Sequence, residues 1–118
     1  MIVINRNSFD FPAVTFVGQT GNSETTYAYF NTKAKPLFDG YGYVKVLKAT
    51  QHIFLIPQIE NGTNHLKILR TRGYVRVCSV LFKDLGLKDK AYKIYKYKQG
   101  FAIKLNEPIH QKGGQTSQ

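Results

Sequence analysis

The sequence predicts a mainly β protein with a small barrel-like body, and three observations support this class. Short runs rich in β-branched and aromatic residues recur along the chain, glycine-containing turns separate them, and helical periodicity is scarce. At 118 residues the chain is long enough for one domain to bury a core without disulfide bonds. We expect one β domain over residues 1–110 and a flexible tail at 111–118, where no apolar residue promotes order.

Nine runs are expected to form strands because they combine β-branched and aromatic residues over short lengths. Their ranges are 2–4, 13–17, 25–30, 43–47, 53–56, 66–69, 74–78, 91–95 and 101–105. Turn sequences that adopt positive φ at low cost lie between them, at 18–22, 39–40, 61–62, 72–73 and 99–100. Residues 1–24 are expected to add a hairpin to one edge of the body.

One segment is predicted to be a short helix. Residues 80–86 place apolar side chains at positions 81, 82 and 85, with Ser79 as the N-cap and Gly86 as the stop. A second helix is expected to begin at Asn31 or Thr32. Pro36 would break that helix unless the proline lies in its first turn.

The same module occurs twice at an offset of 48 residues. Between residues 33–55 and 81–103 five positions are identical, among them Lys45 with Lys93 and Gln51 with Gln99. We expect two tandem repeats, about 25–57 and 73–105, that pack together as one pseudo-symmetric body because neither can bury its apolar face alone. The alternative is that strand-rich sequence with many Lys, Tyr and Ile residues resembles itself through composition.

The charge is strongly positive, with 17 Lys and Arg against 7 Asp and Glu, a net charge of +10 at pH 7. Such an excess attracts polyanions, so nucleic acid is the expected partner. Most of the cations lie after residue 69. The second half is therefore expected to form the binding surface.

Cys78 is the single cysteine, which leaves no disulfide and no multi-thiolate metal site within the chain. Its apolar run predicts a small buried hydrophobe and favours a reducing compartment. No stretch approaches the roughly 18 apolar residues of a membrane span, and residues 1–5 lack the features of a secretory signal. These features predict a cytoplasmic protein without a membrane partner.

No catalytic, cofactor or metal-binding motif is recognisable. His52, His65 and His110 are scattered, and no nucleophile elbow or phosphate-binding glycine loop is present. We expect neither enzymatic activity nor a cofactor.

The candidate binding residues are cations and tyrosines of the second half. Arg70, Arg72 and Arg76 lie on a turn and the strand that leaves it, where guanidinium groups can contact phosphates or guanine edges. The following hairpin places Tyr95 and Tyr97 on one strand face, either to stack unpaired bases or to cover the core. The full predicted set is Arg70, Arg72, Arg76, Lys83, Lys88, Lys90, Lys93, Tyr95, Lys96, Tyr97 and Lys98.

Residues 73–105 begin with Gly73 and a Val-rich strand, continue through a short helix that ends at Leu85-Gly86-Leu87, and close with strands at 93–95 and 101–105. This order resembles the AbrB/SpoVT/MazE-like swapped-hairpin DNA-binding module. The resemblance implies a pair of modules forming one small barrel that presents Arg70, Arg72, Arg76 and Lys83 to DNA. Two departures are Val77-Cys78, where that family usually has Ile-Pro, and Tyr74, where it has a basic residue.

The sequence supports three function classes. The first is a non-catalytic duplex-DNA-binding protein, a small transcription regulator or antitoxin-like protein. The second is a single-stranded DNA-binding protein with an OB-like barrel, of the kind that phages and mobile elements encode, with Tyr92, Tyr95, Tyr97 and Phe101 stacking on bases. The third is a basic inhibitor of an acidic protein. Duplex DNA is the favoured partner, and whether the chain forms a homo-oligomer stays open.

Overall fold

The structure is a computed structural model that describes residues 9–18, 26–71, 74–87 and 89–109. The described strands are β1 (Ala13–Gly18), β2 (Thr26–Phe30), β3 (Tyr43–Lys48), β4 (His52–Gln58), β5 (His65–Lys67), β6 (Leu69–Thr71), β7 (Tyr74–Ser79), β8 (Ala91–Lys93), β9 (Tyr95–Tyr97) and β10 (Gly100–Lys104). Two short helical segments, η1 (Lys35–Phe38) and α1 (Val80–Asp84), follow β2 and β7. The predicted strand at 2–4 and the predicted flexible tail at 111–118 lie outside the described residues.

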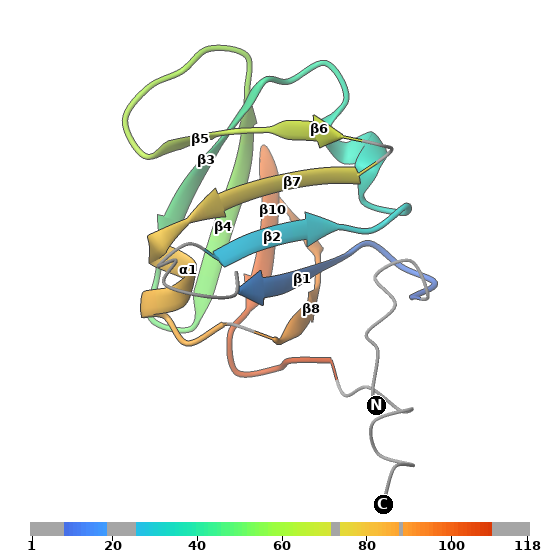
Figure 1. Cartoon of the computed structure of the whole chain (residues 1–118), viewed down its shortest axis with the longest axis vertical. Helices are drawn as coiled ribbons and strands as arrows, with labels where there is room; N and C mark the ends of the chain where they lie inside the picture. Colours follow the sequence, from blue (N-terminus) through green and yellow to red (C-terminus); the bar gives the residue numbers. More distant parts are fainter. Residues whose placement is uncertain (1–8, 19–25, 72–73, 88, 110–118) are drawn as a thin grey trace, which may run out of the picture.

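The strands form two antiparallel sheets. Sheet A has the order β6-β7-β2-β1-β8, and sheet B has the order β5-β3-β4-β10-β9. The longer strands of sheet A run across those of sheet B, so the sheets pack with crossing strands (Figure 1). The mainly β class is confirmed. Within the described ranges, the ladders divide into two sheets and do not close into one barrel.

Two chain segments contribute strands to both sheets and connect them. β5 and β6 are consecutive but pair with β3 and β7, and β8 and β9 are consecutive but pair with β1 and β10. Each segment is interrupted at one buried isoleucine, Ile68 or Ile94. The backbone N–H of Ile68 donates to Gly42 O at 2.9 Å, and that of Ile94 donates to Pro12 O at 3.0 Å. At Ile68 and Ile94 the chain passes from one sheet to the other, which gives the body its barrel-like outline.

Alternate residues of the facing strands fill the space between the sheets. Sheet A contributes Val14, Phe16, Ala28, Phe30, Val75 and Val77, and sheet B contributes Val44, Val46, Ile53, Leu55 and Ile103. Each helical segment adds one buried phenylalanine, Phe38 from η1 and Phe82 from α1. Because burial of one such ring stabilises by about 1.5–3 kcal/mol, packing holds these short helices in place more than their own hydrogen bonds do.

Helix α1 has the predicted caps. The Ser79 side chain accepts a hydrogen bond from the backbone N–H of Leu81 at 3.0 Å, and Gly86 follows the C-cap with φ of 72°. The expected start of the first helix at Asn31 or Thr32 is wrong. The segment η1 is a 3₁₀ turn that begins at Lys35, with Pro36 in its first turn, where the missing N–H costs no hydrogen bond.

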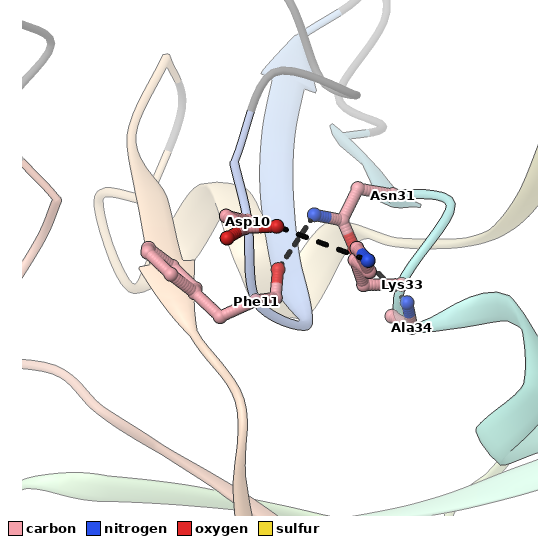
Figure 2. Close-up of polar contacts among 5 residues, drawn as sticks. All are labelled: Asp10, Phe11, Asn31, Lys33 and Ala34. Carbon is pink, nitrogen blue, oxygen red and sulfur yellow. Dashed lines mark hydrogen bonds and ion pairs between the residues drawn. The ribbon is translucent and has the colours of Figure 1, made fainter.

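The Asn31 side chain joins two segments of the chain (Figure 2). It is 1% exposed, and its Oδ1 accepts hydrogen bonds from the backbone N–H groups of Ala13 at 3.1 Å and Ala34 at 3.0 Å. Its Nδ2 donates to Phe11 O at 2.8 Å. These bonds tie the start of β1 to the chain before η1. The exposed Lys33–Asp10 pair, at 3.8 Å, spans the same segments and contributes little.

The offset of 48 residues recurs in the strand register. Leu47 pairs with Phe54 in the β3–β4 hairpin, and positions 95 and 102, each 48 residues later, pair in the same way between β9 and β10. Two of the strand pairs that the offset makes equivalent lie side by side, β2 with β7 in sheet A and β4 with β10 in sheet B, whereas β3 lies beside neither β8 nor β9. The extents of the two repeats stay a prediction.

Cys78 is half-buried on the outer face of sheet A, not in the core as the sequence analysis expects. Side chains alternate along a strand, and Val75 and Val77 occupy the inward positions of β7. Cys78 therefore faces outward, across from Tyr27 of β2. Neither η1 nor α1, the helical segments of the described ranges, approaches the length of a membrane-crossing helix.

Candidate nucleic-acid interface

The outer face of sheet B carries a hollow of about 350 Å³, which we name the aromatic pit. It is lined by His52, Phe54, Tyr95, Lys96, Tyr97, Ala102 and Lys104. Strand β10 lies between β4 and β9, so that Ala102 pairs with Phe54 on one side and Tyr95 on the other. Gly100 and Ala102 of β10 lie on this face, and they have no side chain and a small one, respectively. The floor of the pit is therefore low between its aromatic walls.

The walls of the pit are rings from two strands. Tyr97 of β9 and Phe54 of β4 lie 4.7 Å apart between ring centroids, with 32° between their planes. His52 lies nearly parallel to Phe54, at 5.8 Å and 6°. Tyr97 is 43% exposed, whereas Tyr95 is half-buried. Ring faces beside a hollow of this size can stack against a planar base.

Lysine ammonium groups surround these rings. The Lys104 ammonium lies 4.5 Å from the centroid of the Tyr95 ring, the Lys93 ammonium 5.4 Å from the same ring, and the Lys98 ammonium 5.4 Å from the Tyr97 ring. No carboxylate of the described residues lies within 4 Å of these three ammonium groups. Their charge is therefore available to an anionic ligand.

Part of the predicted site is brought together at the pit. Tyr95, Lys96 and Tyr97 line it, and Lys93 and Lys98 stand beside it. The sequence analysis leaves open whether Tyr95 and Tyr97 cover the core or face outward. They face outward, because the register sets Tyr95 opposite Ala102 and Tyr97 opposite Gly100 on the outer face of β10.

Arg70 is exposed, but its guanidinium group forms hydrogen bonds within the chain. One of its guanidinium nitrogens, Nη2, donates to Phe38 O at 2.7 Å and to Tyr41 O at 2.8 Å. These carbonyls belong to the end of η1 and the loop that follows, so Arg70 holds this turn against β6. Phe38 O also accepts a hydrogen bond from the backbone N–H of Tyr41 at 3.2 Å, so Arg70 adds a second bond to this carbonyl.

The Arg76 guanidinium group also contacts residues of the same chain, on the neighbouring strand β2 of sheet A. Its guanidinium carbon lies 4.8 Å from the Tyr27 ring centroid and 5.8 Å from that of Tyr29, and its Nη1 donates to the Tyr29 hydroxyl at 3.1 Å. The side chain is half-buried on the outer face of sheet A. That face lies on the opposite side of the core from the pit.

The other predicted cations are spread over the surface. Lys83 is exposed on α1, and Lys90 is exposed in the chain before β8. Arg72 and Lys88 lie outside the described residues.

Two aromatic residues of the single-strand hypothesis do not face the pit. Tyr92 is 1% exposed, so its ring cannot stack on a base, and Phe101 is partly buried against the core. Burial raises the pKa of the Tyr92 hydroxyl above its usual value of 10.0. The same hydroxyl donates to Leu105 O at 3.3 Å.

Four residues of the pit are absent from the predicted site: His52, Phe54, Ala102 and Lys104. Period-two alternation gives a partial signal, because buried Ile53 and Leu55 imply that the residues flanking them face outward. Alternation does not show that β4 and β9 lie on either side of β10. Only the sheet order brings the two halves of the pit together.

The arrangement is suited to holding a flat, electron-rich or anionic ligand between rings and ammonium groups. Comparison of the chain with protein-family models, with curated proteins and with solved structures gave no match. The swapped-hairpin resemblance therefore stays a prediction.

Proposed function

We propose that the protein is a non-catalytic binder of single-stranded nucleic acid and that the aromatic pit is its base-binding site. The observation that carries this proposal is the placement of exposed and half-exposed rings around a hollow floored by Ala102, with lysines beside them. Stacking on an aromatic side chain contributes about 1–3 kcal/mol per base, and lysines neutralise the phosphates of the same strand.

A duplex fits this surface less well. Its base faces are covered by neighbouring base pairs, so a base would have to leave the stack before it could enter the pit. The arginine group that favoured duplex DNA gives weaker support, because Arg70 and Arg76 are engaged within the chain. The duplex-binding regulator is the alternative that the following experiment tests.

The experiment compares a labelled oligo-dT with a mixed-sequence duplex of equal length by fluorescence anisotropy at several salt concentrations. We expect tighter binding of oligo-dT. About four lysines stand at or beside the pit. For each phosphate that a protein contacts on a single strand, log affinity falls by about 0.7 for every tenfold rise in salt, so the log–log salt slope should be near −3. Tighter binding of the duplex would overturn the proposal.

A pair of variants at one position locates the site. Ala102→Leu fills the floor of the pit and should weaken oligo-dT binding at least about tenfold, since a base can no longer lie between the rings. Ala102→Ser is the matched control, because it keeps the floor low and should retain most of the affinity. Circular dichroism checks that both variants are folded. Full binding by a folded Ala102→Leu variant would exclude the pit as the site.

A further inference from the structure

The polar groups that line the aromatic pit are strongly biased towards hydrogen-bond donors. Lys104 carries an ammonium group, which donates and cannot accept, and the ammonium groups of Lys93 and Lys98 lie beside the pit rings. The Lys96 ammonium lies 6.0 Å from the Phe101 ring, because Lys96 alternates with Tyr95 and Tyr97 along β9. No aspartate or glutamate lines the pit. Only the tyrosine hydroxyls and the His52 ring can accept a hydrogen bond. A ligand whose edge carries acceptors is therefore better matched than one whose edge carries amino groups.

Lys104 is the best placed of these donors. Its side chain is half-buried on β10, two residues after the floor of the pit. The Tyr95 ring lies 4.5 Å from its ammonium and His52 is its cross-strand neighbour, so the side chain is held between two pit residues. A donor held in position loses less conformational entropy on binding than a free surface lysine does.

Nucleobases differ in the group that such a donor would meet. Thymine, uracil and guanine carry a keto oxygen where cytosine and adenine carry an amino group. A keto oxygen accepts a hydrogen bond from an ammonium group. An amino group in the same position is itself a donor, so it would face the ammonium without forming a hydrogen bond. The difference is independent of stacking, because every base has a π-face.

We propose, on the basis of the single-strand function above, that the aromatic pit selects keto bases over amino bases and that Lys104 is the residue that selects. A cationic ligand is a poorer fit. Aromatic cages do bind quaternary ammonium groups, but here the ammonium groups of Lys93 and Lys104 already lie over the Tyr95 ring.

The test uses two oligonucleotides of equal length, one of thymidine and one of 5-methyl-deoxycytidine. Their bases share the methyl group and ring size and differ in the keto or amino edge, so differences in stacking are small. Wild-type protein should bind the thymidine oligomer about fivefold more tightly, as one charge-assisted hydrogen bond at a partly exposed site would give. Equal affinities would overturn the proposal.

Lys104→Met keeps the apolar stem and removes the donor, so it should abolish the preference. Lys45→Met is the matched control, because Lys45 is half-buried on β3, on the same face of sheet B but outside the pit. This control should lose affinity equally for both oligomers and keep the preference. A preference that survives in Lys104→Met would overturn the assignment of Lys104. If neither oligomer binds to wild-type protein, the single-strand function itself fails.

Discussion

The rings of Phe54 and Tyr97 meet at 4.7 Å although their strands, β4 and β9, are not neighbours in sheet B. They meet across β10, where Tyr97 pairs with Gly100 and Phe54 pairs with Ala102, two residues without large side chains. A Cβ at Gly100 would lie 2.5 Å from the carbonyl oxygen of Leu55. The glycine therefore allows β10 to lie close to β4, and it leaves space on this face beside the Phe54 and Tyr97 rings.

Gly100→Ala should destabilise the protein. The clash is with a backbone oxygen, so β10 must shift away from β4, at a cost of about 1–3 kcal/mol in the free energy of unfolding. Urea unfolding followed by circular dichroism measures this loss. A variant as stable as the wild type would show that β10 does not approach β4 as closely as described.

Tyr95→Leu and Tyr97→Leu should weaken binding of oligo-dT more than they weaken the fold. Each change keeps apolar bulk but removes a ring, so affinity should fall by about 1 kcal/mol or more per site. Tyr74→Leu is the control, because Tyr74 is similarly exposed, at 39%, but belongs to sheet A. Anisotropy titrations and melting temperatures are measured together. Lower melting temperatures with unchanged affinity would instead make these tyrosines structural.

Arg70→Ala should lower stability and change single-strand affinity little. Two hydrogen bonds from its guanidinium to Phe38 O and Tyr41 O are lost, one of them exposed, so the free energy of unfolding should fall by about 1–2 kcal/mol. Arg70→Lys should restore part of the stability, since both bonds come from one nitrogen and an ammonium can donate to two carbonyls, although from a more flexible stem. A loss of affinity without loss of stability would show that Arg70 takes part in nucleic-acid binding.

Asn31→Ala should be among the most destabilising single changes outside the apolar core. It leaves the N–H of Ala13 and the O of Phe11 without their side-chain partner and removes a bond to Ala34. We expect a loss of about 2–4 kcal/mol in the free energy of unfolding, because a buried polar group without a partner pays its desolvation cost. Removal of the exposed Lys33–Asp10 pair by Lys33→Ala is the control and should cost under about 1 kcal/mol.

Tyr92 should make the fold sensitive to alkaline pH. Burial raises its pKa in the folded state above 10.0, so the unfolded chain releases this proton at a lower pH than the folded protein does. Its contribution is constant below about pH 10 and is lost as the pH rises further. Tyr92→Phe should show a shallower fall in unfolding free energy above about pH 10 than the wild type. Parallel curves for the two proteins would contradict the raised pKa.

The local elements of this protein are determined by its sequence. Alternation and turn residues located most strands of the described ranges, and the Ser79 and Gly86 caps fixed α1, because these features depend on neighbours within a few residues. The runs predicted as single strands at 66–69 and 91–95 are each divided between the two sheets, which no local pattern indicates. Tyr92 lies on β8 in sheet A, apart from Tyr95 and Tyr97 on β9 in sheet B. Within β9, alternation places the two tyrosines on one strand face and Lys96 on the other. Which face of a strand is buried depends on how the two sheets pack, which the local sequence does not specify.

The location of the pit and the contacts of Arg70 and Arg76 depend on tertiary structure. The pit exists because β10 is placed between β4 and β9, and such pairings join residues far apart in the sequence through backbone hydrogen bonds that no local pattern records. Arg70 is held by the carbonyl oxygens of Phe38 and Tyr41, which are 32 and 29 residues away in the sequence and come within reach only in the folded chain. Composition gave the protein its positive charge, and strand order decided which lysines stand beside aromatic rings.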